Sequence, residues 1–342
     1  MKTIVLTGGG TAGHVMPHLA LLPELKKHFD RIAYIGSIGG MEKNIICKHK
    51  QIDYFEISAH KLNRSKPLKN IVLPFLFIKS VQQAKQLLKK IKPNIVFSKG
   101  GYVSLPVVFA AKSLSIPVVA HESDLSAGLA NKLCKPKAKV ICTTFEETAH
   151  KIGKKGVYTG SPIIQTEFET IKKSKPILLI TGGSLGASAV NNAVFECAKE
   201  LATVFYVIHQ VGKGKTNKML HIDDYQQIEF ASNMQQLIYS ADIVISRGGS
   251  NTIFELAYAQ KPMLIIPLPK GASRGDQVEN AKNFEKLSWA KVLYQDNLNK
   301  QTLLNSVNEL YQNKNQYITT LKNAKIPNGT QKILEILLKY QK

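Results

Sequence analysis

The stretch Ala241-Asp-Ile-Val-Ile-Ser-Arg-Gly-Gly-Ser-Asn-Thr-Ile-Phe-Glu255 decides the fold of this chain. Its short apolar run, Ile243 to Ile245, favours a parallel strand that is buried on both faces. Gly248 and Gly249 allow a sharp turn and a close approach of the backbone to a ligand. Ser250 is expected to cap the helix that follows. A strand, a glycine turn and a helix in this order direct unpaired N–H groups and the positive end of a helix dipole at one point, which favours a phosphate.

The same arrangement recurs along the chain. Glycine loops follow strands predicted at 2–7, 94–99 and 176–181, and they read Gly8-Gly9-Gly10-Thr11-Ala12-Gly13-His14, Lys99-Gly100-Gly101-Tyr102 and Gly182-Gly183-Ser184-Leu185-Gly186-Ala187. Further strands are predicted at 53–57, 117–122, 139–143, 157–159 and 263–267, with helical patterns between them. Strands and helices that alternate in this way are typical of a doubly wound parallel sheet. The second strand ends at Ser37 without an acid to hold an NAD ribose, which counts against a dinucleotide oxidoreductase.

The two halves of the chain echo each other. Ser98-Lys99-Gly100-Gly101 leads through a helix to Pro117, and Ser246-Arg247-Gly248-Gly249 leads through a helix to Pro262. We therefore predict an α/β protein with two Rossmann-like domains facing a central cleft. The boundary is placed after Gly160-Ser161-Pro162, giving domains at 1–162 and 163–328. The last helix, within 329–342, is expected to pack back onto the first domain.

Composition describes an ordinary globular chain with an uneven charge. The formal net charge is +22, and residues 1–160 hold 25 Lys and Arg against 9 Asp and Glu, whereas residues 161–342 hold 21 against 15. A basic first half suggests an anionic partner. No apolar run approaches the length of a membrane span, and the chain opens directly on a strand, so no signal peptide is expected. The four cysteines have no metal-ligand spacing and are expected to be reduced, mostly buried thiols.

An apolar segment ringed by lysines lies in the first half. It comprises Leu73, Phe75, Leu76, Phe77 and Ile78, flanked by Lys66, Lys69 and Lys79. This pattern favours a surface that rests on an anionic bilayer without crossing it. The alternative is a core helix with a solvated lysine face. Nucleic acid is not expected as a partner, because neither a recognition motif nor an aromatic stacking ladder is present.

Polar residues gather at predicted strand ends, where open α/β sheets bind ligands. His121-Glu122-Ser123-Asp124 ends the strand at 117–122. Glu255 lies about one turn into its helix, where a carboxylate can accept hydrogen bonds from a ribose. Gln277 and Asn280 share one helix face, and their amides suit sugar hydroxyls. The alternative for that segment is a helix capped by Asp276 with exposed amides.

With these residues assembled, the chain resembles the MurG family of peptidoglycan N-acetylglucosaminyltransferases over nearly its whole length. The resemblance rests on the loops quoted above, on His121-Glu122 with Gly128-Leu129-Ala130-Asn131-Lys132, on Ser246 through Glu255, and on Gln277 with Asn280. It implies a GT-B fold and an inverting transfer of GlcNAc from UDP-GlcNAc to the muramic acid 4-hydroxyl of lipid I, giving lipid II. The enzyme would be peripheral, at the cytoplasmic face of the cell membrane.

The resemblance also implies roles for particular residues. Ser184 and the helix start at Ser250 would meet the diphosphate, Glu255 the ribose, Gln277 the GlcNAc, and the backbone near Phe230 and Ala231 the uracil. Further donor-site residues are Arg247, Gly249, Asn251, Thr252 and Asn280, together with Thr11, Ala12 and Gly13, which also face the acceptor side. Gly100, Gly101 and Tyr102 would lie on the acceptor side. The general base stays open among His14, Glu122 and Asp124.

The chain departs from the family pattern at two places. Asp124 stands where the family often has Asn, and Ile163 and Ile164 stand where it has an Arg shortly after the domain junction. The leaving-group charge would then fall to helix N-termini and to Arg247. Because fixed N–H donors stabilise a departing diphosphate on their own, the motifs require no metal or other cofactor, although dependence on a divalent metal stays open. The nearest rival is a related GT-B enzyme that glycosylates diacylglycerol.

Overall fold

The computed structural model describes residues 1–62, 71–164, 169–183, 185–271 and 274–342. These residues form two compact units. Unit 1 comprises Met1–Ile164 and Asn328–Lys342, and unit 2 comprises Gln165–Pro327. Three of the predicted site residues, Lys66, Lys69 and Ser184, lie outside the described residues.

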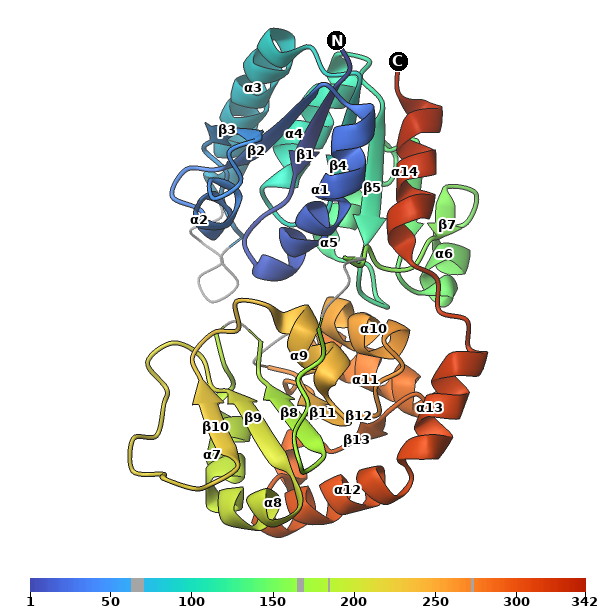
Figure 1. Ribbon diagram of the computed structural model, residues 1–342. Coiled ribbons are helices and arrows are strands. Elements are labelled where there is room, and N and C mark those ends of the chain that lie inside the picture. The colour runs from blue at the N-terminus through green and yellow to red at the C-terminus, as the bar shows by residue number, and fades with distance from the viewer. Residues whose placement is uncertain (63–70, 165–168, 184, 272–273) are drawn as a thin grey trace. The chain divides into compact units, whose positions relative to one another are not determined.

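Unit 1 is built on a parallel sheet of order β3-β2-β1-β4-β5-β6-β7 (Figure 1). Its strands are β1 (Thr3–Thr7), β2 (Arg31–Ser37), β3 (Ile52–Ile57), β4 (Ile95–Ser98), β5 (Val118–Glu122), β6 (Val140–Thr143) and β7 (Gly156–Tyr158). Its helices are η1 (Ala12–His14, a 3-10 turn), α1 (Met16–His28), α2 (Met41–Ile46), α3 (Leu73–Ile91), α4 (Ser104–Ser113), α5 (Leu129–Cys134), α6 (Glu146–Ile152) and α14 (Gly329–Tyr340).

Unit 2 has a parallel sheet of order β10-β9-β8-β11-β12-β13. Its strands are β8 (Ile177–Thr181), β9 (Tyr206–Gln210), β10 (Tyr225–Ile228), β11 (Ile243–Ser246), β12 (Met263–Ile265) and β13 (Lys291–Val292). Its helices are α7 (Ser188–Glu196), α8 (Ala198–Val204), α9 (Met234–Ser240), α10 (Ser250–Tyr258), α11 (Asp276–Lys286), η3 (Gln295–Asn297, a 3-10 turn), α12 (Lys300–Gln312) and α13 (Lys314–Asn323). The prediction of two doubly wound parallel sheets is confirmed.

Both faces of the first sheet are covered, as its apolar strands require. Along β1, Ile4 and Leu6 pack with helices α1 and α14, whereas Val5 packs with α3 and α4. Helix α14, from the end of the chain, lies beside α1 (Figure 1). It contributes Ile333, Leu334 and Leu337 to that core, each buried. Burial of such side chains stabilises by about 1.5–3 kcal/mol each, which fixes the end of the chain on unit 1.

Each predicted strand occurs, with bounds that differ by at most two residues from the prediction. Strands β9, β10 and β13 were not predicted. Strand β10 reads Tyr-Gln-Gln-Ile and β13 has two residues, so neither gives a clear apolar run. Both are held by backbone pairing to a neighbouring strand, which is a tertiary contact.

The order of strands reverses at equivalent places in the two sheets. In unit 1, β1 lies between β2 and β4, and Thr7 pairs with Ser98. In unit 2, β8 lies between β9 and β11, and Thr181 pairs with Ser246. Open α/β sheets bind ligands beyond the strand ends at such a switch point. The four glycine loops seen in the sequence begin at these strand ends.

Candidate active site

In unit 1 the loops after β1 and β4 touch. A Cβ on Gly101 would lie 2.4 Å from the carbonyl oxygen of Gly9, and Gly101 has φ +79°, so only glycine fits there without strain. The Tyr102 ring covers Gly10, where a Cβ would lie 2.7 Å from the ring. The structure therefore brings Gly100, Gly101 and Tyr102, which were predicted to lie on the acceptor side, to the loop that carries His14.

The His14 ring is held in a defined orientation. Its Nδ1 lies 3.0 Å from the Gly9 carbonyl oxygen and 3.0 Å from Thr11 Oγ1. Because a carbonyl oxygen only accepts hydrogen bonds, Nδ1 carries the hydrogen. When the ring is neutral, its lone pair is therefore on Nε2. His14 is half-buried, at the end of η1 and two residues before α1, so it follows a helical turn and does not itself begin α1.

A buried carboxylate that the sequence analysis missed supports this loop. Glu42, at the start of α2, is fully buried, and its Oε1 accepts hydrogen bonds from the Ser37 N–H at 2.8 Å and the Ser37 hydroxyl at 2.5 Å. Its Oε2 lies 3.4 Å from the Gly10 N–H. Glu42 thus joins the end of β2 to the first glycine loop. Sequence reasoning missed it because one Glu within a polar stretch carries no signal of burial.

Glu122 is an anchor for the loop that follows β5. One oxygen accepts from the Asp124 N–H at 3.0 Å, and the other accepts from the Gly128 N–H and from Asn131 Nδ2, both at 2.9 Å. Burial, followed by the nearby Asp124 charge, raises the pKa of Glu122, and these hydrogen bonds oppose that shift. Since both oxygens are engaged and the residue is 4% exposed, this geometry disfavours Glu122 as the base. Asp124 is half-buried.

In unit 2 the glycine turn after β11 opens α10. Gly249 is the N-cap, and no side chain caps the helix. The prediction that Ser250 caps it is wrong, because the helix begins one residue earlier and Ser250 is its buried first residue. A Cβ on Gly249 or Gly183 would meet no atom within 4 Å, so there is open space beside both loops. At Gly248 a Cβ would lie 2.6 Å from the Gln277 carbonyl oxygen, so α11 passes close behind the turn.

Glu255 is oriented by a side chain that the sequence did not single out. Its Oε1 accepts a hydrogen bond from Gln235 Nε2, on α9, at 3.0 Å. Burial raises the pKa of Glu255, and the bond from Gln235 lowers it. Glu255 lies on the second turn of α10, whose first turn contains Asn251 and Thr252, both half-buried.

Three predicted donor-site side chains bond to the protein's own backbone. Arg247 Nη1 donates to the Ile266 and Pro267 carbonyls at 3.0 and 3.3 Å, and its Nη2 donates to Gln295 Oε1 at 2.8 Å. Asn280 is fully buried and donates to the Gly248 carbonyl at 3.2 Å. Gln277 Oε1 accepts from the Leu268 N–H at 3.0 Å. In this structure the guanidinium and the Asn280 amide hold the turn after β11.

Gln210, at the end of β9, links two loops of unit 2. Its Nε2 donates to the Gly183 carbonyl and its Oε1 accepts from the Ala231 N–H, both at 3.0 Å. The Ala231 N–H is therefore engaged within the protein, and the exposed Phe230 precedes it. Gln210 is buried and was missed in the sequence because an amide at a strand end is common.

Ile163 is one of the two positions after the domain junction where the sequence departs from the family pattern, and the structure shows what it contacts. Ile163 is buried, its N–H donates to Thr330 Oγ1 at 3.1 Å, and the Thr330 hydroxyl donates to the Ile163 carbonyl at 3.0 Å. This position joins the end of the first segment of unit 1 to the start of α14. An apolar residue suits it because its side chain is removed from water.

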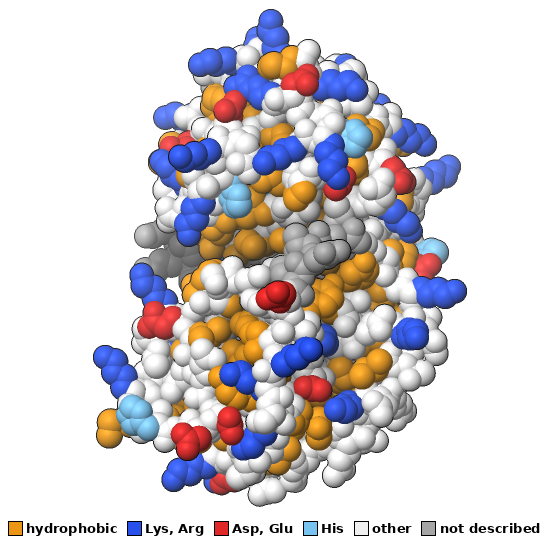
Figure 2. All heavy atoms as spheres, in the orientation of Figure 1, with side chains coloured by type: hydrophobic (Ala, Val, Ile, Leu, Met, Phe, Trp, Pro, Cys, Tyr) orange, Lys and Arg blue, Asp and Glu red, His pale blue; other side chains and the backbone are white. Residues whose placement is uncertain are grey.

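The predicted apolar segment forms the first turns of α3. Phe75 is 76% exposed and Ile78 55% exposed, and Ile71 and Val72, just before the helix, are also exposed. Leu73, Leu76 and Phe77 are half-buried and Lys79 is exposed. The alternative of a core helix fails for these turns, since burial within α3 begins at Ser80. Figure 2 shows many more Lys and Arg than Asp and Glu side chains on the visible face of unit 1.

Packing brings Lys137, from the chain after α5, close to this segment. The Phe77 ring meets the Phe109 ring of α4 edge to face at 5.2 Å between centroids, and Lys137 Nζ lies 3.8 Å from the centroid of Phe109. Leu129 and Leu133, one turn apart on α5, are also exposed. No helix within the described residues is long and apolar enough to cross a bilayer.

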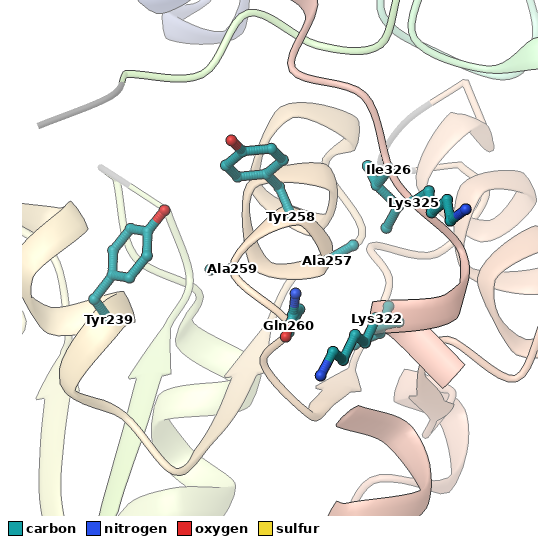
Figure 3. Close-up of a pocket in the computed structure, with 9 residues that line it drawn as sticks. Tyr239, Ala257, Tyr258, Ala259, Gln260, Lys322, Lys325 and Ile326 are labelled. Carbon is teal, nitrogen blue, oxygen red and sulfur yellow. The ribbon is translucent and has the colours of Figure 1, made fainter. Parts of the chain in front are cut away.

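A separate hollow in unit 2, about 460 Å³ in volume, lies at the C-terminal end of α10 (Figure 3). Tyr239, Tyr258, Lys322 and Lys325 contribute to its wall. It contains none of the predicted site residues. Over the same described part of the chain, no three His, Cys, Asp or Glu side chains gather in a way that suits a metal ion.

The glycine loops at both switch points, the oriented His14 and the carboxylate of Glu255 one turn into an uncapped helix fit a two-domain enzyme that binds a nucleotide sugar, and the comparisons give its class as a glycosyltransferase. Residues 4–143 match the glycosyltransferase family 28 N-terminal domain, and residues 177–335 match the family's C-terminal domain. The chain is 47% identical to UDP-N-acetylglucosamine--N-acetylmuramyl-(pentapeptide) pyrophosphoryl-undecaprenol N-acetylglucosamine transferase of Clostridium botulinum (strain 657 / Type Ba4), with full coverage of both chains.

It is 46% identical to the protein of the same name from Clostridium tetani (strain Massachusetts / E88), covering 99% of this chain and 98% of the relative. The crystal structure of Acinetobacter baumannii MurG aligns with a TM-score of 0.76 at 27% identity, over 99% of this chain and all of that one. The chain therefore belongs to the MurG family of N-acetylglucosaminyltransferases, as its motifs indicated.

Proposed function

We propose that this protein transfers GlcNAc from UDP-GlcNAc to the pyrophosphoryl-undecaprenol-linked N-acetylmuramyl pentapeptide, lipid I, to give lipid II and UDP. The observation that carries the proposal is identity of 46–47% along the whole chain to relatives named for this transfer. The glycine loops at the strand ends of both units support the proposal. The proposal assigns the donor to unit 2 and the acceptor to unit 1.

Unit 2 suits a nucleotide diphosphate. The first N–H groups of α10 have no side-chain cap and lie beside open space at Gly249, so they are donors for phosphate oxygens. Glu255, oriented by Gln235, accepts from the ribose hydroxyls. Gly249, Ser250, Asn251 and Thr252 form the diphosphate side of the site. By family likeness, Ser184 joins them and Gln277 meets the GlcNAc hydroxyls. Arg247 and Asn280 act by holding the turn.

The chemical step is a single displacement that inverts the anomeric carbon. The acceptor 4-hydroxyl oxygen forms the new bond as the bond to the UDP oxygen breaks. The hydroxyl proton passes to His14 Nε2, whose lone pair is fixed by the Nδ1–H bond to Gly9. Negative charge grows on UDP and is stabilised by the fixed N–H donors. In this scheme Asp124 and the Tyr102 ring border the acceptor, and Glu122 anchors the loop beside it.

The exposed apolar turns of α3 support contact with the membrane. Phe75 and Ile78 are exposed and would enter the boundary between headgroups and acyl chains, whereas Lys79 and Lys137 would meet anionic lipid. Unit 1 would thus sit at the cytoplasmic face of the membrane, close to a lipid-linked substrate. The anionic bilayer, lipid I and UDP-GlcNAc are the partners proposed.

The test is incubation of the purified protein with UDP-GlcNAc and a short-chain lipid I analogue. We expect UDP release that requires both substrates, and a disaccharide product. Diacylglycerol offered as the acceptor separates the related lipid glycosyltransferase from this assignment. Transfer to diacylglycerol without transfer to the lipid I analogue would overturn the proposal.

A further inference from the structure

A buried lysine at the unit 1 switch point has no role in the scheme above. Lys99 directly follows β4 and is 2% exposed. Its Nζ lies 2.6 Å from His121 Nδ1 and 2.7 Å from Ser123 Oγ. A buried ammonium is costly unless its environment compensates for the lost water, and an apolar side chain of similar length would fill the same space. The presence of Lys99 therefore calls for a chemical reason.

The direction of the hydrogen bonds around Lys99 can be assigned. His121 is fully buried, and its Nε2 lies 3.1 Å from the Gly160 carbonyl oxygen. That oxygen can only accept, so Nε2 carries the ring hydrogen and Nδ1 holds the lone pair. Burial, reinforced by Lys99, keeps the pKa of His121 well below its usual value, so the ring is neutral. Lys99 Nζ thus donates to His121 Nδ1.

Ser123 is the point at which this buried network meets the surface. It is half-buried, whereas Lys99 and His121 are inaccessible. When Lys99 is an ammonium, it has no lone pair, so it donates to Ser123 Oγ and the hydroxyl hydrogen must be directed elsewhere. Among the residues that the structure describes, that hydrogen has no protein acceptor. When Lys99 is a neutral amine, its own lone pair can take the Ser123 hydrogen.

We propose that Lys99 and Ser123 form an anion contact for the acceptor, in which the buried ammonium turns the Ser123 hydroxyl outward to donate to an oxygen of the acceptor diphosphate. The inference rests on the proposed function and adds two residues to it. Ser123 touches the substrate, and Lys99 is a positioning residue that acts through Ser123.

The charges that face Lys99 make the contact sensitive to pH. Burial lowers the pKa of Lys99 to about 7, against the opposing effects of Glu122, Asp124 and Cys142. His121 faces the same nitrogen but is neutral, and His18, from α1, is neutral because burial and Lys99 lower its pKa to about 3. Near neutral pH, Lys99 is therefore partly protonated, and an anion at Ser123 favours the protonated form. Asp124 opposes the anion, and the Lys99 charge offsets it.

The experiment measures steady-state kinetics with the short-chain lipid I analogue, for wild type and for the S123A, S123T and K99M variants. We expect S123A and K99M to raise the KM for this acceptor about tenfold, the loss of one hydrogen bond to a charged group. The KM for UDP-GlcNAc should change less than twofold, and S123T should restore the acceptor KM because it keeps the hydroxyl. Ser126→Ala, at an exposed serine of the same loop, is the matched control.

Two further readouts separate this role from a merely structural one. Between about pH 6 and about pH 9 the wild-type acceptor KM should rise with pH, whereas S123A and K99M should lose that dependence. Inhibition by a muramyl pentapeptide methyl glycoside that lacks the diphosphate should be the same for wild type and S123A. Thermal unfolding of each variant checks that it folds, and S123A tests the contact even where K99M does not fold.

An unchanged acceptor KM in S123A, or an equal loss of affinity for donor and acceptor, would overturn the contact. So would weaker inhibition of S123A by the glycoside without diphosphate. If wild type itself transfers nothing to the lipid I analogue, the proposed function fails, and that result differs from a failure of Lys99 and Ser123 alone.

Discussion

At the scale of single residues, backbone carbonyls set the chemistry of several side chains. The Gly9 carbonyl places the hydrogen of His14 on Nδ1, and the Gly160 carbonyl places that of His121 on Nε2. When neutral, the two rings therefore hold their lone pairs on different nitrogens. His14 is left with a basic Nε2 on a half-buried ring, while His121 turns its basic nitrogen to buried Lys99. Of the two, His14 is the candidate base.

His14→Ala is expected to lower kcat by about 10²–10⁴-fold, because the acceptor proton loses its base. Affinity for UDP-GlcNAc should stay within about twofold, since the proposal assigns the diphosphate, ribose and GlcNAc contacts to residues of unit 2. Turnover assays and donor binding by calorimetry measure the two effects. His28→Ala, at the exposed last residue of α1, is the control. Unchanged turnover in His14→Ala would exclude His14 as the base.

Glu255→Ala is expected to weaken UDP binding about tenfold or more, as for other lost hydrogen bonds to a charged group. Gln235→Leu should produce a smaller loss in the same direction, because it frees the carboxylate that Gln235 orients. Titration of the protein with UDP measures both. Glu279→Ala, at an exposed acid on α11, serves as the control. Wild-type affinity in Glu255→Ala would rule out the ribose contact.

At the scale of elements, the two switch-point loops are built alike. Lys99 and Arg247 occupy the same position after paired strands, one residue beyond Ser98 and Ser246. Each cation bonds to the end of the neighbouring strand. Lys99 bonds to His121, within the end of β5, and to Ser123 just after it, and Arg247 bonds to the carbonyls after β12. Arg247 bonds to carbonyls and an amide, which fix it in place. Lys99 bonds to an imidazole and to a hydroxyl, and the Ser123 hydroxyl can change from acceptor to donor when Lys99 loses its proton.

Helix α3 exposes apolar side chains in its first turns and is buried only from Ser80 onward, and this leads to a prediction about membranes. Phe75→Ser and Ile78→Ser together are expected to weaken binding to anionic vesicles by about tenfold or more, because two exposed apolar side chains no longer enter the lipid. Vesicle sedimentation at low and high salt measures it, and salt should weaken the wild type as well. Met219→Ser, at an apolar side chain of unit 2 that is 88% exposed, controls for loss of surface hydrophobicity in general. Equal binding of the double variant and wild type would remove α3 from the membrane contact.

At the scale of the whole molecule, each unit contains a buried histidine that makes the native protein less stable in acid. Burial lowers the pKa of His18 in unit 1 and of His209 in unit 2 to about 3 each. The unfolded chain takes up these protons near pH 6.5, and the native protein does not. Stability should therefore fall as the pH drops from about 6.5 toward about 3, by about 1.4 kcal/mol per pH unit for each histidine. Below about 3 both states are protonated and the loss ends.

Urea unfolding followed across this pH range measures the effect. His209→Gln should reduce the steepness of the loss, although it also disturbs the bonds to Tyr225 and Asn191. Exposed His60→Gln should leave the steepness unchanged. A wild-type stability that is flat between these pH values would contradict the neutral state of the two buried rings.

Much of the fold follows from the sequence because its signals are local. Each glycine loop directly follows an apolar run, so strand, turn and helix are visible within about 15 residues. The Ser-cation-Gly-Gly segment occurs once in each half of the chain, and this repetition predicts two similar sheets. The weakly apolar strand β10 could not be seen in this way, because only its pairing with β9 makes it a strand.

The same distinction between local signals and tertiary contacts applies to the candidate site. Residue types at strand ends or in the segments that directly follow them, such as Glu122, His14 and Glu255, are visible in sequence because parallel strands end together. Their partners are not: Glu42, Gln235 and Gln210 reach the site from other elements, and single polar residues carry no signal of where they will be buried. Sequence likewise placed Asn280 and Arg247 in the site, and the structure shows both bonded to backbone carbonyls.

By itself, the sequence determined the two doubly wound sheets, the glycine loops at the strand ends and the family, since all three depend on residues that are neighbours along the chain. Tertiary structure alone decided which hydrogen each buried ring carries, which carboxylate is engaged and why Lys99 lies beside Ser123. Those properties depend on burial and on which carbonyl or amide faces each side chain. Contacts of that kind join residues that are far apart in sequence, and they exist only once the chain has folded.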